Sequence, residues 1–353
     1  MTSVSVISAI KEENNVGDLG GFYTDPTIAS FLVTWAISPS TKRILEPGCG
    51  EAIFLRAAAQ LITQGKLNRA VELVGVELSS NALKRAREKF AEFHRIKVRM
   101  LERNFFDVRK DELGPLDAVV GNPPFIRHHR FKGHLLQSAV ERCLETGVNL
   151  RGTASSWAHF LVYACSMLKP GGRLAVILPE ELLVAEYSRA VWKFLSSHFQ
   201  RILVLSPRNS IFPSVTQKTV LLLGDNAARG PAVVNIGSFS GIHSIGRISV
   251  ESFWSSARTL AVKDVTDSKR RASEYLIPGD IVSLYSCLAR RIGITKLSSF
   301  GSVRIGYVTG DNDFFTLTKD KVETWSIQSD FLSPTICKTR EVCLLYTSDA
   351  ADE

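Results

Sequence analysis

The feature of this sequence that most constrains its fold is an alternation, before residue 230, of short apolar runs with amphipathic segments. Short runs rich in β-branched residues are typical of buried strands, and apolar residues three or four positions apart are typical of a helix with one buried face. In residues 81–93, Leu83, Ala86 and Phe90 recur at this helical spacing between charged side chains. The pattern predicts an α/β fold, with a mostly parallel sheet covered by helices on both faces. The seven predicted strands are Arg43–Glu46, Val71–Glu77, Lys97–Leu101, Asp117–Gly121, Arg173–Leu178, Arg201–Leu205 and Thr219–Leu223.

The chain is longer than most single domains, and its pattern changes part-way along. Its 353 residues exceed the usual domain, which holds roughly 100–200 residues. After Gly224 the elements become shorter and richer in Ser and Gly, and a charged stretch follows at 269–271. We therefore predict a first domain over residues 1–230 and a second, α+β domain over residues 231–342.

Composition and charge exclude some classes of protein. No run approaches the roughly 20 apolar residues of a membrane span, and the start lacks a signal-peptide pattern, so we expect a cytoplasmic protein without a membrane partner. The six cysteines form no CxxC pair, which argues against a zinc site and against a disulfide framework; no metal is predicted. The formal charge of +8 favours a polyanionic partner, although charge alone is weak evidence.

The first predicted strand ends in Glu46 and runs into a turn that contains Gly48 and Gly50. Glycines let the chain turn tightly and let a ligand approach the backbone, at the sheet edge where α/β folds bind nucleotides. The next strand ends in Glu77, where an acid can accept both hydroxyls of a ribose. Alternatively, Glu77 stabilises the start of the following helix through the helix dipole. The spacing matches neither the dinucleotide fingerprint nor a phosphate-binding loop, which disfavours those two ligand classes.

After the third predicted strand the chain continues with Asn104 and Phe105, followed by Phe106 and Asp107. An amide or carboxylate with an aromatic neighbour at this edge can hold and cover an adenine ring. Packing in the core explains the two phenylalanines equally well.

The fourth predicted strand ends in the sequence Asn122-Pro123-Pro124-Phe125. Two consecutive prolines fix the backbone and remove its N–H groups. Such a turn can present the side-chain oxygen of Asn122 and the carbonyl of Pro123 to an amino group, with the Phe125 ring as a stacking face. We take these four residues as the candidate catalytic residues.

Together these motifs resemble those of the adenine-N6 DNA methyltransferases of bacterial restriction–modification and phage-defence systems, in the class whose cofactor motifs precede the catalytic motif. The resemblance covers residues 20–340. It implies a Rossmann-like class I methyltransferase fold, S-adenosyl-L-methionine as cofactor, double-stranded DNA as partner, and methylation of N6 of an adenine flipped out of the duplex. The cofactor contacts that it implies are Tyr23, Thr24, Pro26, Glu46, Gly48, Gly50, Glu77, Asn104 and Phe105.

The resemblance also assigns the second stacking residue and shows two departures from the family pattern. Phe212 matches the aromatic that stacks on the flipped base opposite Phe125. The family usually has Asp where this chain has Asn104, unless Asp107 takes that role, so the contact to the cofactor adenine stays open. The family more often has Tyr than Phe at position 125, a change that keeps the stacking face.

The chemistry expected of this site needs neither a strong base nor a metal. The lone pair of the adenine amino group is delocalised into the ring, and acceptors at Asn122 and Pro123 would localise it toward the methyl group by preorganised dipoles and alignment. The basic residues Arg127, Arg130 and Lys132, which follow the motif, are expected to hold the DNA backbone, with a merely solvated loop as the alternative.

Other functions share the Asn-Pro-Pro-aromatic turn, because they too bind an NH2 group. A methyltransferase acting on protein glutamine or on RNA guanine is disfavoured by the long downstream segment. Methylation of cytosine N4 in DNA uses nearly the same acceptors. A catalytically inactive fold that only binds DNA would have to explain why both Glu77 and Asn122 are present.

The segment beyond residue 230 adds expectations about partners and completeness. Residues 301–315 resemble the opening of the recognition domain in methyltransferases fused to or partnered with nucleases, so a separate nuclease or defence-system subunit is an expected partner. Residues 343–353 resemble a translated sequencing adaptor more than protein sequence. We therefore expect a truncated fragment with a partial DNA target-recognition domain and a non-native tail.

Overall fold

The computed structural model describes residues 24–66, 70–93, 95–150, 153–211, 217–228, 230–246, 249–291, 295, 297–302 and 312–333. The chain divides into two compact units, residues 1–282 and residues 283–353, which are described separately below. None of the helices within the described ranges combines the length and the apolar composition that a membrane span requires.

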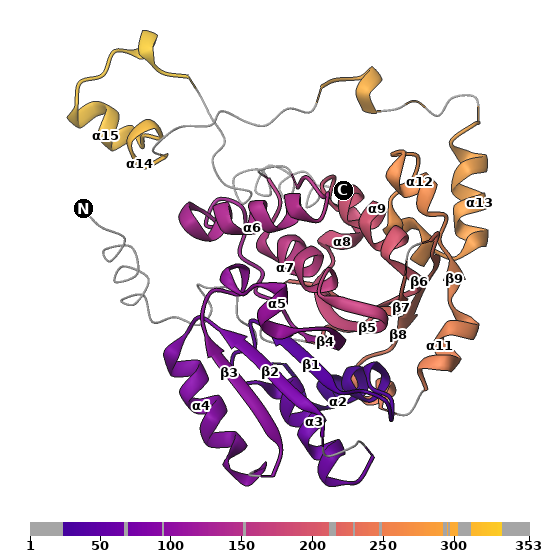
Figure 1. Cartoon of the computed structure of the whole chain (residues 1–353). Helices are drawn as coiled ribbons and strands as arrows, with labels where there is room; N and C mark the ends of the chain where they lie inside the picture. The colour runs from indigo at the N-terminus through magenta and orange to yellow at the C-terminus, as the bar shows by residue number, and fades with distance from the viewer. Residues whose placement is uncertain are drawn as a thin grey trace. The chain divides into compact units, whose positions relative to one another are not determined.

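The first unit is built around one mixed sheet of nine strands, in the order β3-β2-β1-β4-β5-β7-β6-β8-β9 (Figure 1). The five strands from β1 to β5 pair in parallel, and β7 lies antiparallel between β5 and β6. The strands are β1 (Arg43–Pro47), β2 (Glu72–Glu77), β3 (Lys97–Glu102), β4 (Leu116–Gly121), β5 (Leu168–Pro179), β6 (Phe199–Pro207), β7 (Thr219–Ala227), β8 (Val233–Phe239) and β9 (Arg258–Thr259).

The α/β class and the seven predicted strands are confirmed, but the predicted total of seven strands is wrong. β8 pairs in parallel with β6, and the two-residue β9 pairs antiparallel with β8. The sequence pattern missed β8 because Asn235, Gly237 and Ser238 interrupt its apolar residues, after the change in texture near residue 230. The sheet therefore continues past the predicted domain boundary, and the functional division at that boundary stays a prediction.

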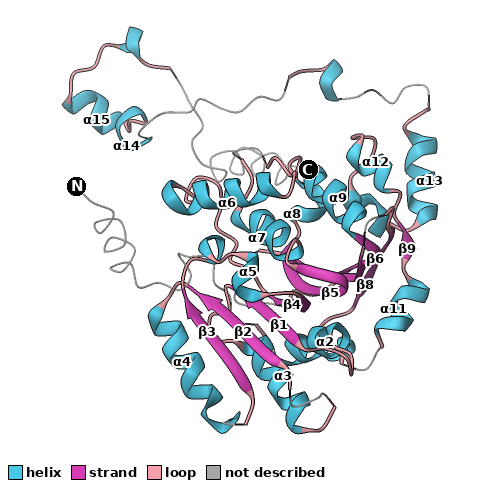
Figure 2. Cartoon of the chain, in the orientation of Figure 1, coloured by secondary structure: helices cyan, strands magenta, loops and turns pink. Residues whose placement is uncertain are grey.

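Helices cover both faces of the sheet, as predicted (Figure 2). Successive strand residues point to opposite faces, so Ile44 packs in one apolar cluster with α2, α3 and α4, whereas Leu45 packs in a second with α6, α7 and α9. Val120 and Val119 divide between the two clusters in the same way. The helices of this unit are α2 (Pro26–Ala36), α3 (Ile53–Thr63), α4 (Ser80–Phe90), α5 (Lys110–Leu113), α6 (Gly133–Glu145), α7 (Ser156–Cys165), α8 (Glu181–Val184), α9 (Ser188–His198), α10 (Ile242–Ile245), α11 (Val250–Ser256) and α12 (Val262–Thr266), with α13 (Gly279–Leu288) at its boundary.

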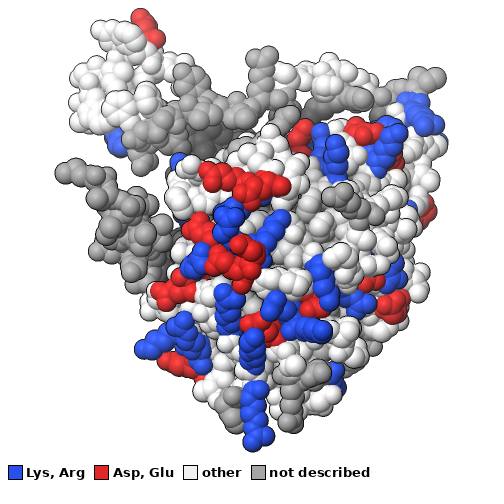
Figure 3. All heavy atoms as spheres, in the orientation of Figure 1, with Lys and Arg blue, Asp and Glu red and all other residues white. Residues whose placement is uncertain are grey.

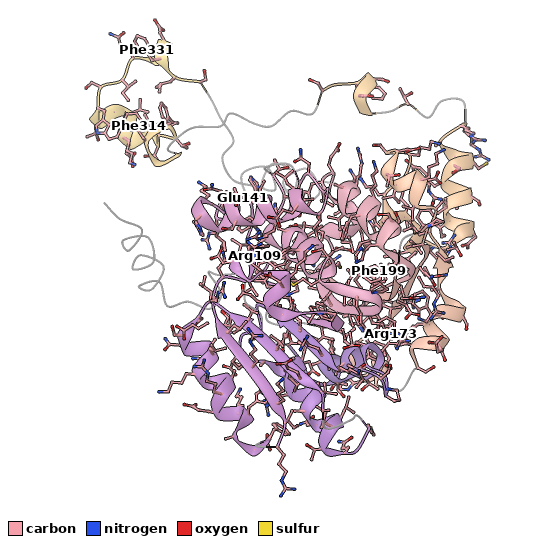
Figure 4. All side chains as sticks on the ribbon, in the orientation of Figure 1. Arg109, Glu141, Arg173, Phe199, Phe314 and Phe331 are labelled. Atoms are coloured by element: carbon pink, nitrogen blue, oxygen red, sulfur yellow. The ribbon has the colours of Figure 1, made fainter. Side chains whose placement is uncertain are left out.

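The described part of the second unit contains the short helices α14 (Asn312–Phe315) and α15 (Lys319–Thr324). Its aromatic side chains are largely exposed: Phe314 is 62% and Phe331 80% exposed, and both are labelled in Figure 4. Within its described residues this unit therefore buries little apolar surface of its own.

Candidate active site

The turn between β1 and α3 is shaped by three residues with positive φ: Gly48 at +64°, Gly50 at +52° and Ala52 at +56°. A Cβ on Gly48 would lie 3.0 Å from Cδ of Pro124, so the glycine turn packs closely against the Pro-Pro turn after β4. A Cβ on Gly50 would meet no described atom within 4 Å. The turn thus leaves backbone accessible at the carboxyl edge of the sheet, where a ligand can approach it.

Glu77 ends β2 and joins this turn to the next helix. Its Oε2 accepts a hydrogen bond from the amide of Gly50 at 2.8 Å, and its Oε1 accepts one from the amide of Ser79, the N-cap of α4, also at 2.8 Å. The second contact is the helix-start role that we considered as an alternative for Glu77. The two roles are compatible, because each carboxylate oxygen can accept a further hydrogen bond.

Leu78 follows Glu77 and is a residue that the sequence pattern did not single out. Its apolar side chain is 48% exposed next to the carboxylate. An exposed leucine is unremarkable alone, but here it offers an apolar surface beside the predicted ribose acceptor.

Glu46 lies at the end of β1 and is 2% exposed. Its Oε2 accepts a hydrogen bond from the amide of Leu55 in α3 at 3.0 Å. Burial raises the pKa of this carboxyl well above its ordinary value; the amides of Leu55 and Phe54 oppose the rise and the charge of Glu77 adds to it. Glu46 is therefore a buried acid that lies close to a second acid.

Asn104 begins the short turn after β3, and its two amide atoms differ. Oδ1 accepts a hydrogen bond from the amide of Phe106 at 3.2 Å. Nδ2 is buried and has no hydrogen-bond partner among the described residues. The neighbouring Phe105 is buried and stacks on Phe160 of α7 at 5.3 Å between ring centroids. The core-packing role considered for Phe105 is thus present, and its predicted contact with the cofactor stays a prediction.

Asn122 follows β4, and its amide is held through the nitrogen, whereas that of Asn104 is held through the oxygen. Its Nδ2 donates a hydrogen bond to Oγ1 of the buried Thr24 at 3.3 Å. Its Oδ1 is buried and finds no donor in the described part of the chain. The structure therefore brings together Thr24, a predicted cofactor contact, and Asn122, a predicted catalytic residue, from positions 98 residues apart.

Ser156, the first residue of α7, fixes the Asn-Pro-Pro-Phe turn after β4, a role that the sequence pattern did not indicate. Its hydroxyl donates to the carbonyl of Pro124 and accepts from the amide of Ile126 at 2.8 Å. Its own amide donates to the carbonyl of Ile126 at 3.0 Å. Serines before an apolar helix signal a helix start, but nothing in the sequence links that start to the turn after β4.

The other predicted site residues fall into three groups. Tyr23 and Phe212 lie outside the described residues. Pro26 is exposed in the first turn of α2, and Phe125 is buried, with 5% of its surface exposed. The predicted DNA-backbone residues Arg127, Arg130 and Lys132 are all exposed on the segment between the catalytic turn and α6.

The surface charges do not form a single positive field on the face shown in Figure 3. Lys and Arg side chains there alternate with Asp and Glu over α4, α5 and α6. The ion pairs of the structure include Arg103–Glu112 and Arg142–Glu145. Acidic side chains therefore offset basic ones over this region.

Comparison with protein families shows which family the chain belongs to. The model of the N-6 DNA methylase family matches residues 10–223, which include the glycine turn, Glu77 and the whole Asn-Pro-Pro-Phe turn after β4. The chain belongs to the N-6 DNA methylase family. A second model, the C-terminal domain of the type II methyltransferase M.Eco57I, matches residues 269–352.

Known proteins of this kind are similar at low identity. The type II methyltransferase M.AccI of Acinetobacter calcoaceticus is 23% identical over 91% of this chain and 57% of its own length. The type IIG restriction endonuclease BpuSI resembles 94% of this chain with a TM-score of 0.57 at 15% identity, over 42% of that protein. A protein described as a class I S-adenosylmethionine-dependent methyltransferase from Listeria monocytogenes resembles 68% of this chain with a TM-score of 0.51 at 19% identity, over 71% of that protein.

These likenesses support the class I methyltransferase fold of this member of the N-6 DNA methylase family. The chain spans about half the length, or less, of the curated relatives that it matches, from 57% of M.AccI downward. Activity, substrate and partners of the whole protein are accordingly treated as proposals.

Proposed function

We propose that this chain is an adenine-specific DNA methyltransferase of a restriction–modification system, which transfers a methyl group from S-adenosyl-L-methionine to N6 of a flipped adenine. The observation that carries the proposal is the buried Oδ1 of Asn122, for which the described residues offer no donor. A buried polar atom without a partner costs about 1–3 kcal/mol. An amino group of the target base would satisfy it, and membership of the N-6 DNA methylase family supports adenine in DNA as its source.

The orientation of the Asn122 amide supports its role as an acceptor. Because Nδ2 is held by Thr24, the side chain presents oxygen to the site. Oδ1 of Asn122 and the carbonyl of Pro123 would bind the two protons of the amino group. As the nitrogen becomes tetrahedral, its lone pair then points away from the ring, so these dipoles stabilise the transition state without a charged base.

The residues at the ends of β1 and β2 fit S-adenosyl-L-methionine, which supplies a methyl group bonded to a positively charged sulfur. Gly50 lies beside open space, and each oxygen of Glu77 retains a lone pair for a ribose hydroxyl. Leu78 adds an exposed apolar surface. Thr24 contacts the catalytic asparagine, which supports the proposal that the chain around Tyr23, Thr24 and Pro26 binds the methionine end.

Base stacking and DNA contact complete the proposal. We propose that Phe125 and Phe212 hold the two faces of the flipped base, which offsets the unstacking of the duplex. Phe125 is buried in this structure, so the base would reach it through the small exposed part of its ring. The exposed Arg127, Arg130 and Lys132 follow directly, where they would bind phosphates of the displaced strand.

The match to the C-terminal domain of the type II methyltransferase M.Eco57I covers residues 269–352, within the segment after residue 230. We propose that this segment supplies the contacts that select a sequence, because readout of base edges needs side chains placed in a groove. A nuclease or another defence-system subunit is the partner that a restriction–modification role requires.

The deciding experiment is transfer of a radiolabelled methyl group from the cofactor to duplex DNA, followed by nucleoside analysis. Label recovered in N6-methyl-2′-deoxyadenosine supports the proposal. Label in N4-methyl-2′-deoxycytidine, or on RNA or protein supplied in parallel, would replace the substrate assignment. Binding of both cofactor and duplex DNA without any transfer would favour a fold that only binds DNA.

A further inference from the structure

Two asparagine side chains at the carboxyl edge each have one amide atom in a hydrogen bond and the other without a partner among the described residues. The atom without a partner is an acceptor in one asparagine and a donor in the other. Asn122 has its donor tied and its acceptor free, whereas Asn104 has its acceptor tied to the amide of Phe106 and its donor free. Turning the Asn104 amide by half a revolution would place its NH2 group against the N–H of Phe106, two donors facing each other. Asn104 therefore presents a hydrogen-bond donor.

The position of this donor follows from the strand register. Glu102 of β3 pairs with Glu77, and the amide of Arg103 donates to the carbonyl of Glu77 at 3.0 Å. Asn104 is the next residue along the chain. It thus lies at the end of the strand beside the predicted ribose acceptor, on the edge where nucleotide ligands bind in open α/β sheets.

The turn that Asn104 begins also packs behind the glycine turn. Phe105 stacks on Phe160, and a Cβ on Gly48 would lie 3.5 Å from Cε1 of that same Phe160 ring. The ends of β1 and β3 are therefore joined through one aromatic ring. A ligand seated along Gly50 and Glu77 would extend toward the end of β3.

We propose that Nδ2 of Asn104 donates a hydrogen bond to a ring nitrogen of the cofactor adenine. This inference rests on the proposed binding of S-adenosyl-L-methionine. The adenine amino group is flanked by N1 and N7, which are both acceptors, whereas the amino group itself is a donor and cannot pair with a second donor. An aspartate at this position would have the opposite preference, so Asn104 determines which edge atom of the adenine is bound.

The test on the unaltered chain is titration calorimetry with S-adenosylhomocysteine and with its 1-deaza, 7-deaza and 3-deaza forms, in which CH replaces one ring nitrogen. We expect either the 1-deaza or the 7-deaza form to bind about tenfold more weakly, the usual size of one hydrogen bond to a buried donor. The 3-deaza form should bind within about twofold of the parent, because N3 does not flank the amino group.

The variant test uses Asn104→Asp, which keeps the shape and removes the donor. The penalty on the 1-deaza or 7-deaza form should disappear in this variant. Asn226→Asp is the matched control: Asn226 already donates to Oε1 of Gln200 at 2.6 Å, at the other end of the strands, and should leave the ratio unchanged. Asp107→Asn, in the same turn as Asn104, should also leave it unchanged, and equal thermal midpoints verify folding.

Each outcome decides a different point. Equal binding of all four compounds to the unaltered chain would overturn the inference while leaving the proposed function intact. A penalty that persists in Asn104→Asp, or that disappears in Asp107→Asn, would remove the role from Asn104. Failure of the unaltered chain to bind S-adenosylhomocysteine at all would overturn the proposed cofactor, and this inference with it.

Discussion

The two ends of the strands each carry a buried glutamate, and the environments of the two glutamates are opposite. At the strand starts, Glu72 of β2 binds Arg43 at 2.7 Å and Lys97 at 3.3 Å. Burial alone would raise its pKa, but these partners outweigh burial and lower the pKa of Glu72. At the strand ends, burial raises the pKa of Glu46 well above its ordinary value, and the nearby Glu77 raises it further.

The same contrast holds for other polar groups at the two edges. At the same edge as Glu72, Asp225 near the end of the antiparallel β7 binds Arg173 at 2.9 Å and Arg201 at 2.6 Å. At the ends, Asn104 and Asn122 each bury an atom that no described residue satisfies. Buried polar groups are normally paired; Glu72 and Asp225 follow this rule, whereas Asn104 and Asn122 depart from it. Such departures are expected where a ligand completes the site.

The largest expected effect comes from an unsatisfied group. Asn122→Ala should lower methyl transfer by about 10²–10³-fold or more, because it removes an acceptor that acts in the transition state. The cofactor dissociation constant should change little, because Asn122 is proposed to contact the base. Single-turnover methylation and calorimetry on the same preparation measure both quantities. Near-normal turnover would contradict the mechanism.

At the strand starts, the expected effect is on stability. Asp225→Ala leaves two arginines facing each other and should lower the free energy of unfolding by about 3 kcal/mol, the lower end for breaking a buried pair because both arginines are partly exposed. Urea denaturation measures the change. The control is Asp111→Ala, since Asp111 is 79% exposed and 3.5 Å from Arg109; it should cost less than about 1 kcal/mol. Figure 4 labels Arg173 and Arg109, one arginine from each pair. If both variants lose the same free energy of unfolding, the ion pairs of Asp225 stabilise the protein no more than an exposed pair does.

The glutamate that ends β2 should affect ligand binding more than stability. Glu77→Ala should weaken cofactor binding by about 1.5–3 kcal/mol, as expected for hydrogen bonds to a charged group. Glu77→Gln keeps one acceptor oxygen and should lose less, which separates the ribose contact from general disruption of the turn. An unchanged dissociation constant in calorimetry would leave Glu77 with only its helix-start contact to Ser79.

Sequence reasoning located the strand ends because strand periodicity and glycine or proline turns are local signals. Gly48, Gly50 and the Asn122-Pro123 turn lie where those signals place them. β8 was missed because polar and glycine residues interrupt its apolar residues. The division of roles at residue 230 and the stacking role of Phe212 stay predictions.

The sequence could not show which side-chain atoms are hydrogen-bonded and to which partners. The clamp of Ser156 on Pro124 joins residues 32 positions apart, and the contact of Asn122 with Thr24 joins residues 98 apart. Which end of the Asn104 amide is free depends on a backbone N–H two residues away, which exists only once the turn has formed. The contacts of Ser156 and Asn122 are tertiary and leave no periodic trace in the sequence, whereas that of Asn104 depends on a local turn.

The smallest expected effect is an increase in the free energy of unfolding, whereas substitutions of buried residues usually lower it. Glu46→Gln should raise the free energy of unfolding by about 1 kcal/mol at pH 8, because it removes a buried carboxyl whose raised pKa reflects an unfavourable charge. Above the ordinary carboxyl pKa the unfolded chain releases this proton while the folded chain retains it, so stability falls as pH rises. The gain from Glu46→Gln should therefore grow with pH and vanish below pH 4.5, the ordinary value.

Glu72→Gln, the matched substitution at the strand starts, should have the opposite sign and the opposite pH dependence. The folded-state pKa of Glu72 is lowered, so its contribution is present above its ordinary pKa and is lost as pH falls through the folded-state value. Urea denaturation of both variants from pH 4 to pH 8 measures the two slopes. Suppose that Glu46→Gln stabilises the protein but weakens cofactor binding, and that Glu72→Gln destabilises it. This result would show that ligand-binding residues at the strand ends lower the stability of the fold. If both variants are destabilised with the same slope, the two edges do not differ as their pKa shifts indicate.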